Sequence, residues 1–243
     1  MTNSDKGPTT TPSQLGRRVE ELNATLRDVE PGTLCVRTGA SFEPGEAESG
    51  AFHLAYWGRE ISLTYPEFSC YKQGGDELGI MDRAMLAYYF TTSDGTPLTG
   101  RWISFSELPD GKFYAQAFQG YSGGELAKVF ENDVEGFTRT AVSIGGRNPD
   151  SGQPIGDMAF AYQVLPHVRL LVACWLGDED FPPSYRVLFD AAAGHHLSTD
   201  AYAILGSMLT KRLIKAGGDR GSGTGDQGSG TGDRGSETGD VTE

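Results

Sequence analysis

The stretch DMAFAYQVLPHVRLLVACWLGDEDFPPSYRVLFD, residues 157–190, decides the fold. Two apolar runs of strand length, DMAFAYQV and RLLVACWL, are separated by Leu165-Pro166-His167 and Val168, and a third run, YRVLFD, follows an acidic turn. Apolar runs of this length that are bounded by turn residues are typical of β-strands. Because the three runs follow one another without an intervening helix, they predict a mostly antiparallel sheet.

Upstream of this stretch, the pattern alternates between helical and strand-like periodicity. Residues 13–26 predict a helix that Ser13 caps, with an apolar residue on one face at positions 15, 19, 22 and 26. The run AFHLAYWGREISLTY, residues 51–65, predicts a β-hairpin that turns at Gly58-Arg59. ELGIMDRAMLAYYF, residues 77–90, predicts a second helix with an apolar stripe at 81, 84, 85 and 88.

The remaining elements complete an α+β pattern. RWISF (101–105) and KFYAQAF (112–118) predict strands, and helices are expected around Glu125–Phe130 and Asp133–Ile144. A last helix begins near Ser198-Thr199; its cations Lys211, Arg212 and Lys215 suit the negative end of a helix dipole. We therefore expect an α+β fold, a single domain with a mostly antiparallel sheet and helices packed on it.

The two ends of the chain differ from this domain in composition. Residues 217–243 repeat the motif GDRGSGT with small changes and contain almost no apolar side chains. Such a segment buries too little apolar surface to offset the entropy of ordering the chain. We expect a disordered N-terminus over 1–11, one domain over 12–216 and a disordered, acidic tail over 217–243.

Composition excludes several function classes. The formal net charge is −13, which argues against a nucleic-acid groove and against binding to anionic membrane surfaces. The polar N-terminus does not resemble a signal peptide, and no apolar run is long enough to span a membrane. The three cysteines are odd in number and widely spaced, so we expect reduced thiols in a cytoplasmic protein.

The string GYSGG, residues 120–124, matches the nucleophile elbow of a serine hydrolase, with Ser122 as the nucleophile. Asp190 and His195 follow it in the order that an α/β-hydrolase requires. However, the run before Ser122 contains Gln116 and Gln119, whereas a central parallel strand is normally apolar throughout. A glycine-rich loop is therefore the favoured interpretation, and the hydrolase is the remote alternative.

The acidic run Asp178-Glu179-Asp180 allows two interpretations. These carboxylates, with Asp157 or Asp190 brought close by folding, could bind Mg²⁺ or act as a catalytic pair; Asp157, Asp178 and Asp180 are the candidate metal ligands. The simpler interpretation is a solvated turn where the chain leaves the core. The turn is favoured.

The histidines and tryptophans give weaker indications. His195 and His196 lack the spacing of a zinc site, and although they could ligate a haem or a corrinoid, a turn before the last helix is favoured. Trp57, Trp102 and Trp175 lie in strand-like surroundings and are interpreted as core residues.

Several segments also resemble one protein family. These are Trp102 with residues 104–109 (SFSELP), Gly156-Asp157, residues 175–182 (WLGDEDFP) and residues 188–190 (LFD). In this order they resemble the domain of unknown function 3786 family, over roughly residues 15–215. The resemblance implies a family common in anaerobic bacteria and archaea with no established activity. Some relatives carry an iron–sulfur module and are linked to corrinoid and one-carbon metabolism, but this chain lacks the four-cysteine cluster.

Together these observations favour a cytoplasmic binding or accessory protein, in an anaerobic redox, corrinoid or one-carbon pathway. Its partner would be an unidentified small molecule or protein, and no cofactor is assigned. A metal-assisted enzyme that uses the carboxylates around Asp178 is the alternative. The candidate ligand-binding residues are Trp102, Asp157, Asp178, Glu179, Asp180, Asp190, His195 and His196.

Overall fold

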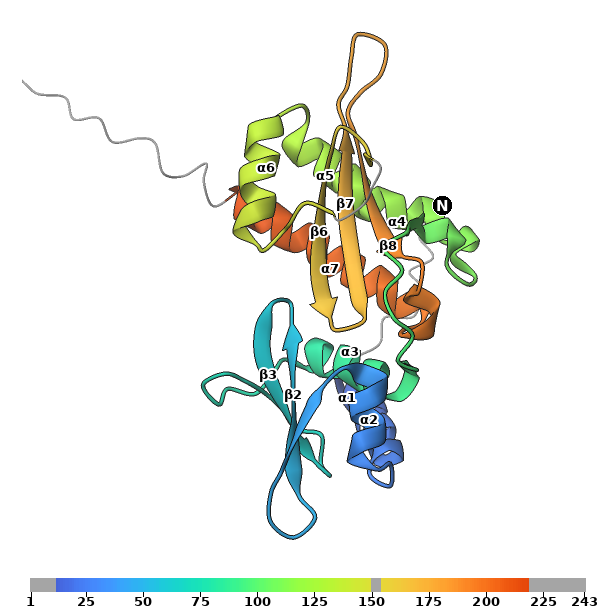
Figure 1. The fold of residues 1–243 in the computed structure, drawn as a ribbon. Helices are drawn as coiled ribbons and strands as arrows, with labels where there is room; N and C mark the ends of the chain where they lie inside the picture. The colour runs from blue at the N-terminus through green and yellow to red at the C-terminus, as the bar shows by residue number, and fades with distance from the viewer. Residues whose placement is uncertain (1–11, 150–153, 219–243) are drawn as a thin grey trace, which may run out of the picture.

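The computed structural model describes residues 12–149 and 154–218 and contains two four-stranded antiparallel sheets with helices packed against them. The chain therefore has the predicted α+β fold, but with two sheets instead of one (Figure 1). The predicted disordered ends, 1–11 and 219–243, lie outside the described residues, whereas 217 and 218 belong to the last helix. No helix in the described ranges is long and apolar enough to cross a membrane.

The first sheet has the strand order β1-β2-β3-β4 and packs against three helices of the N-terminal half. Its hairpin has the predicted alternation, with Phe52, Leu54 and Ile61 among the inward residues. The turn lies at Trp57-Gly58, one residue earlier than predicted, because both residues adopt the left-handed φ (51° and 72°) that a tight hairpin requires. The elements of this half are α1 (Pro12–Leu26), α2 (Pro31–Thr38), β1 (Ser41–Pro44), β2 (Gly50–Tyr56), β3 (Arg59–Tyr65), β4 (Cys70–Lys72) and α3 (Ile80–Thr92).

The second sheet has the order β5-β8-β7-β6, and the three predicted strands of residues 157–190 form β6, β7 and β8. Helices α4 to α7 cover one of its faces (Figure 1). The elements of this half are β5 (Trp102–Ser104), η1 (Phe105–Glu107), η2 (Gly111–Phe113), α4 (Ala115–Tyr121), α5 (Gly123–Phe130), α6 (Val134–Ser143), β6 (Met158–Leu165), β7 (Val168–Trp175), β8 (Ser184–Asp190), η3 (Ala193–His195) and α7 (Thr199–Gly218).

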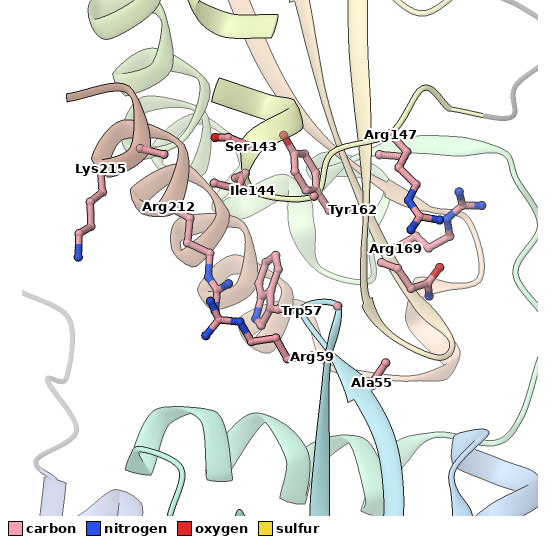
Figure 2. A pocket seen from close by; sticks show the side chains of 15 residues that line it. Ala55, Trp57, Arg59, Ser143, Ile144, Arg147, Tyr162, Arg169, Arg212 and Lys215 are labelled. Atoms are coloured by element: carbon pink, nitrogen blue, oxygen red, sulfur yellow. The ribbon is translucent and has the colours of Figure 1, made fainter. Parts of the chain in front are cut away.

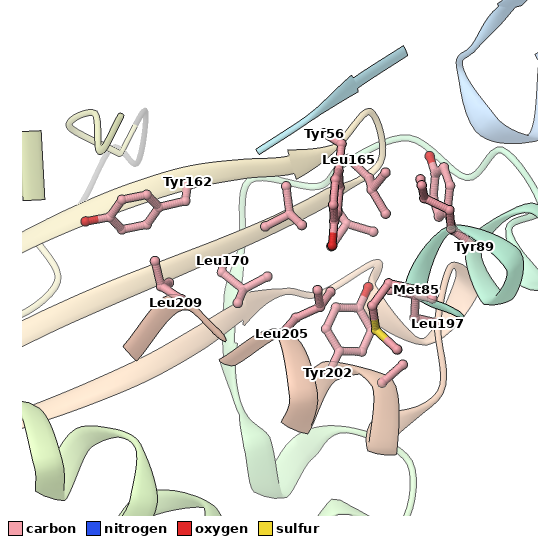
Figure 3. Close-up of a cluster of buried hydrophobic side chains, with 14 of the residues drawn as sticks. Tyr56, Met85, Tyr89, Tyr162, Leu165, Leu170, Leu197, Tyr202, Leu205 and Leu209 are labelled. Atoms are coloured by element: carbon pink, nitrogen blue, oxygen red, sulfur yellow. The ribbon is translucent and has the colours of Figure 1, made fainter. Parts of the chain in front are cut away.

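One hydrophobic core runs through both halves of the chain. Met85 and Tyr89 of α3 lie beside Leu165, Tyr202 and Leu205, which come from β6 and α7 (Figure 3). The two sheets also meet directly, because the backbone N–H of Trp57 donates to the carbonyl of Val164 at 2.9 Å. The turn of the first sheet is therefore attached to the edge strand of the second.

The run KFYAQAF was predicted as a strand and is helical, over η2 and α4. Its aromatic residues do not share one face: Phe113 is 85% exposed, whereas Phe118 is buried and its ring stacks on that of Phe105 at 4.2 Å. Alanine and glutamine, which fill the rest of the run, are good helix formers. Aromatic content alone gave the wrong prediction.

Two other expectations need correction. Met81 is 41% exposed, because the buried face of α3 is centred on Met85, Tyr89 and Phe90 instead. Trp102 and Trp175 are only half-buried; they pack against a small second cluster of Ala161, Leu171 and Ala173, apart from the main core. Trp57, at the hairpin turn, is half-buried as well.

Candidate functional site

The acidic run forms a closed turn at the end of the β7–β8 hairpin. One carboxylate oxygen of Asp178 accepts hydrogen bonds from the backbone N–H groups of Asp180 (2.9 Å) and Phe181 (2.8 Å). The N–H of Asp178 donates to the carbonyl of Phe181 at 2.9 Å, and the side chains of Glu179 and Asp180 are exposed. Asp157 supports the same hairpin, since its carboxylate accepts from the N–H of Leu176 at 2.8 Å. These hydrogen bonds hold the acidic run in a turn between β7 and β8.

Asp190 lies at the opposite end of β8 and is 2% exposed. Its carboxylate accepts hydrogen bonds from the N–H and the hydroxyl of Thr99 (3.0 and 2.9 Å), the N–H of Gly100 (2.8 Å) and the N–H of Ala192 (2.9 Å). Opposite it across the strand pair lies Trp102. These hydrogen bonds connect the backbone just before β5 to the backbone just after β8, and they satisfy the buried carboxylate.

The predicted carboxylate cluster does not assemble. Within residues 12–149 and 154–218, no three His, Cys, Asp or Glu side chains converge on a point that could hold a metal ion. Asp178 and Asp190 are separated by the length of β8. The geometry therefore gives no support to a metal-assisted reaction at these residues.

The elbow that a serine hydrolase requires is also missing. Ser122 is preceded by a helix, α4, and not by a strand. The Ser122 side chain is fully buried, and its hydroxyl donates to the carbonyl of Phe118. The two expected triad partners have other partners: Asp190 binds backbone N–H groups, and a ring nitrogen of His195 contacts the carboxylate of Asp94 at 2.8 Å. These three residues do not form a triad.

His196 is fully buried where the two halves of the chain meet. The hydroxyl of Ser93 donates to the carbonyl of Arg37 at 2.6 Å, so Nδ1–H of His196 must donate to Ser93 Oγ at 2.9 Å. The ring stacks on His167 (5.2 Å), and both Nε2 atoms are buried without a hydrogen-bond partner among the described residues.

The environment of this stacked pair disfavours positive charge. Burial, with a smaller effect from His167, lowers the pKa of His196 to about 4, and burial also lowers the pKa of His167. Hydrogen bonds from Thr96 and then from His195 lower the pKa of Asp94 beside them. The two rings are therefore neutral near pH 7 and act as a packed contact between the halves.

A basic pocket lies where the β2–β3 turn, the edge of β6 and the end of α7 meet. It has a volume of about 820 Å³, and Figure 2 shows side chains that line it. We call this the basic pocket. Among the described residues, its lining includes five cationic side chains and no carboxylate; the cations are Arg59, Arg147, Arg169, Arg212 and Lys215.

Backbone pairing places these cations around the edge of β6. The N–H and carbonyl of Arg147 pair with those of Ala161 at 3.0 and 2.7 Å, which fixes Arg147 beside the strand. Arg169 lies opposite Gln163 on the neighbouring strand β7. On the other side of the pocket, Arg59 begins β3, directly after the turn that is attached to β6.

The remaining wall is the last part of α7. The guanidinium of Arg212 lies over the ring of Trp57 at 4.3 Å, a cation–π contact. Burial lowers the pKa of Arg212, Arg59 lowers it further, and Tyr56 and Asp82 oppose them. Arginine nevertheless stays protonated in proteins. Asp82 itself accepts a hydrogen bond from the hydroxyl of Tyr56 at 2.9 Å.

Four of the five cations of the basic pocket have no acidic partner among the described residues. Across the described part of the chain, neither Arg59, Arg147 nor Arg212 has a carboxylate within 4.0 Å, and the same holds for Lys215. This concentration of positive charge occurs in a chain whose formal net charge is −13. Such a pocket attracts anions and excludes cations.

Almost no sequence pattern indicates this pocket. Its cations are far apart along the chain, and Arg212 and Lys215 were assigned only to the dipole of the last helix. None of the residues predicted to bind a ligand lines the basic pocket. Trp102 comes nearest, since the guanidinium of Arg169 lies 5.8 Å from its ring.

Comparison with known proteins gives one match. The family described as "Domain of unknown function (DUF3786)" matches residues 30–212, which include both sheets and nearly all of the basic pocket's lining. No curated protein and no solved structure matches the chain.

Proposed function

Because the chain belongs to the DUF3786 family, whose description assigns no activity, we propose a function from the site itself: binding of a small polyanionic molecule in the basic pocket. The concentration of five cationic side chains in one pocket carries this proposal. Like charges held close together repel one another, and a bound anion removes that cost.

The lining of the basic pocket supports a small-molecule ligand rather than a nucleic acid. Its volume, about 820 Å³, lies within the range of pockets that hold drug-sized molecules. A nucleic acid would meet the net negative charge of the rest of the chain along its length. We place the protein in the cytoplasm, where phosphorylated and polycarboxylate metabolites are the small polyanions and where its three free cysteines stay reduced.

Arginine is suited to this role because its planar guanidinium donates two parallel hydrogen bonds to a phosphate or a carboxylate. Four of the five cations in the basic pocket are arginines. No reactive group of the pocket indicates a chemical step, so the proposal is binding alone.

Titration calorimetry with inorganic pyrophosphate tests this proposal. The variant Arg59→Gln/Arg147→Gln removes one cation from each side of the basic pocket. We expect it to weaken binding about tenfold, about 1.4 kcal/mol, and to reduce the dependence of Kd on salt concentration.

The matched control is Arg18→Gln/Arg139→Gln, which makes the same change of charge at two arginines that pair with Glu21 and Glu135 elsewhere on the surface. It should bind pyrophosphate as the unchanged protein does. Equal losses in the two variants, or no binding by the unchanged protein at low salt, would contradict the proposal.

A further inference from the structure

Two arginines of the basic pocket lie together where the β2–β3 turn meets the last helix. In Figure 2 the side chains of Arg59 and Arg212 lie beside one another and next to Trp57. The charge of Arg59 lowers the pKa of Arg212, which also places the two guanidinium groups near each other. We call Arg59 and Arg212 the paired arginines.

The fold fixes the backbone on both sides of this pair. Arg59 begins β3, directly after the hairpin turn, and the N–H of Trp57 in that turn donates to the carbonyl of Val164 at 2.9 Å. Arg212 belongs to α7, and the next residue, Leu213, is fully buried in the core. Two positive charges are therefore brought together from separate halves of the chain.

The described residues do not neutralise the paired arginines. Neither guanidinium has a carboxylate within 4.0 Å among them. The charge of Asp82 acts on Arg212, but this carboxylate lies beyond that limit and accepts a hydrogen bond from the hydroxyl of Tyr56. The contact of Arg212 with the ring of Trp57, at 4.3 Å, leaves its charge in place. A bound anion would therefore offset the repulsion within the pair.

Two adjacent guanidinium groups match a phosphate better than a carboxylate. One arginine already satisfies both oxygens of a carboxylate, through two parallel hydrogen bonds. A phosphomonoester has three terminal oxygens and carries close to two negative charges at pH 7, since its second pKa is about 6. One such group can accept hydrogen bonds from both of the paired arginines and balance the charge of both.

The size of the basic pocket favours an ester of phosphate over the free ion. Its volume of about 820 Å³ is far larger than one phosphate group needs. Small residues, among them Ala55, Ala161 and Ala216, form part of the lining. Their short side chains leave space for the alcohol part of an ester.

We propose that the paired arginines hold the phosphate of a phosphomonoester, whose alcohol part extends into the rest of the basic pocket. This inference rests on the proposed anion-binding function; it names the ligand class and the residues that hold its charged end. Because Arg59 belongs to β3 and Arg212 to α7, the bound phosphate joins the first sheet to the last helix.

Titration of the full-length protein with methyl phosphate and with methyl sulfate at pH 7 tests the ligand class. The two ions have the same shape, but the phosphate carries close to two negative charges and the sulfate carries one. Binding is followed by NMR through the Nε and Cζ signals of the arginine side chains, and Arg59→Gln and Arg212→Lys assign the two signals. We expect methyl phosphate to bind about tenfold more tightly than methyl sulfate and to shift the signals of the paired arginines most.

Substitutions of Arg59 test the site. Arg59→Gln should weaken the binding of methyl phosphate about tenfold and remove most of its advantage over methyl sulfate, because one of the two charges is lost. Arg59→Lys keeps the charge without the planar guanidinium and should lose less affinity than Arg59→Gln. The matched control Arg139→Gln, at an arginine that pairs with Glu135, should leave both affinities unchanged. Thermal melting of each variant checks that it is folded.

Hydrogen exchange tests whether the phosphate joins the two halves. The backbone N–H of Trp57 donates to Val164 across the contact between the two sheets, so its exchange reports opening of that contact. Saturating methyl phosphate should slow this exchange severalfold in the unchanged protein and leave it unaltered in Arg59→Gln. Equal exchange with and without methyl phosphate in the unchanged protein would show that the phosphate does not join the halves.

Equal affinities for methyl phosphate and methyl sulfate would show that a single charge is recognised, and the phosphomonoester would be wrong. Shifts centred on Arg147, with no loss of affinity in Arg59→Gln, would overturn the paired arginines as the phosphate site. In either case, binding of pyrophosphate would leave the anion-binding function standing. If neither pyrophosphate nor methyl phosphate binds, both proposals fail.

Discussion

The acidic β7–β8 turn and the basic pocket contrast in how their charges are held. In the turn, adjacent acids lie side by side in the sequence, and Asp178 accepts hydrogen bonds from the next residues of its own loop. In the basic pocket, cations from positions as distant as 59 and 212 are brought together by the fold, and within the described ranges neither Arg59 nor Arg212 has a carboxylate within 4.0 Å.

This difference shows why a conspicuous run of charge is a poor guide to a site. In a short polar segment at a strand end, the polar side chains accept hydrogen bonds from the backbone of the same turn and are solvated by water. A binding pocket needs charges that folding holds close together despite their repulsion, which only long-range contacts provide. Substituting the hydrogen-bonded acid, the buried histidine and the cations in turn separates residues that stabilise the fold from residues that bind a ligand.

The largest expected effect is at Asp190, which should act on stability and not on binding. Asp190→Asn replaces a carboxylate that accepts from Thr99, Gly100 and Ala192 with an amide whose NH₂ group faces those donors. We expect the free energy of unfolding to fall by about 3 kcal/mol, measured by chemical denaturation. Asp178→Asn, at the exposed turn, is the control and should cost less than about 1 kcal/mol.

If Asp190→Asn were as stable as the unchanged protein, the buried carboxylate would not have the structural role assigned to it. A folded variant that loses pyrophosphate binding would instead return Asp190 to the candidate ligands.

The stacked histidines should give the next largest effect, through pH. The folded-state pKa of His196 is about 4, below the ordinary 6.5, so the unfolded chain takes up the proton first as the pH falls. The stability that neutral His196 contributes is complete above pH 6.5 and is lost between pH 6.5 and 4. The loss is about 3 kcal/mol for this shift. Denaturation at a series of pH values measures it.

His196→Gln should flatten the pH profile in this range. Asp94, His195 and Tyr89 also lie near the His196 ring, so their charges are present in every variant. An unchanged slope in His196→Gln would show that another group controls the acid transition.

Much of the fold could be predicted from sequence because its strands and helices have strong periodic patterns. Residues 157–190 predicted three strands, and the structure confirms their antiparallel pairing as β6, β7 and β8. The strand prediction for residues 112–118 was wrong, because aromatic side chains occur on amphipathic helices as well as on strands. The division into two sheets depends on which strands pair, and pairing between distant strands leaves no local pattern.

The candidate site was almost entirely beyond sequence analysis. Arg147 reaches the basic pocket only because its backbone pairs with Ala161, and Arg169 because of the register between β6 and β7. His167 was placed in a turn, as it is, but its stacking on His196 follows from tertiary packing. In contrast, the hydrogen bonds of Asp178 join it to residues two and three positions further along the chain, and such local contacts can be anticipated from sequence.

The most direct test of the central claim compares pyrophosphate binding in two variants by titration calorimetry. Asp178→Asn/Glu179→Gln/Asp180→Asn removes the charges of the acidic turn, and Arg59→Gln/Arg147→Gln removes two charges of the basic pocket. We expect the acidic-turn variant to bind with a Kd within about twofold of that of the unchanged protein, and the arginine variant to bind about tenfold more weakly. The reverse result, with binding lost in the acidic-turn variant and kept in the arginine variant, would contradict it.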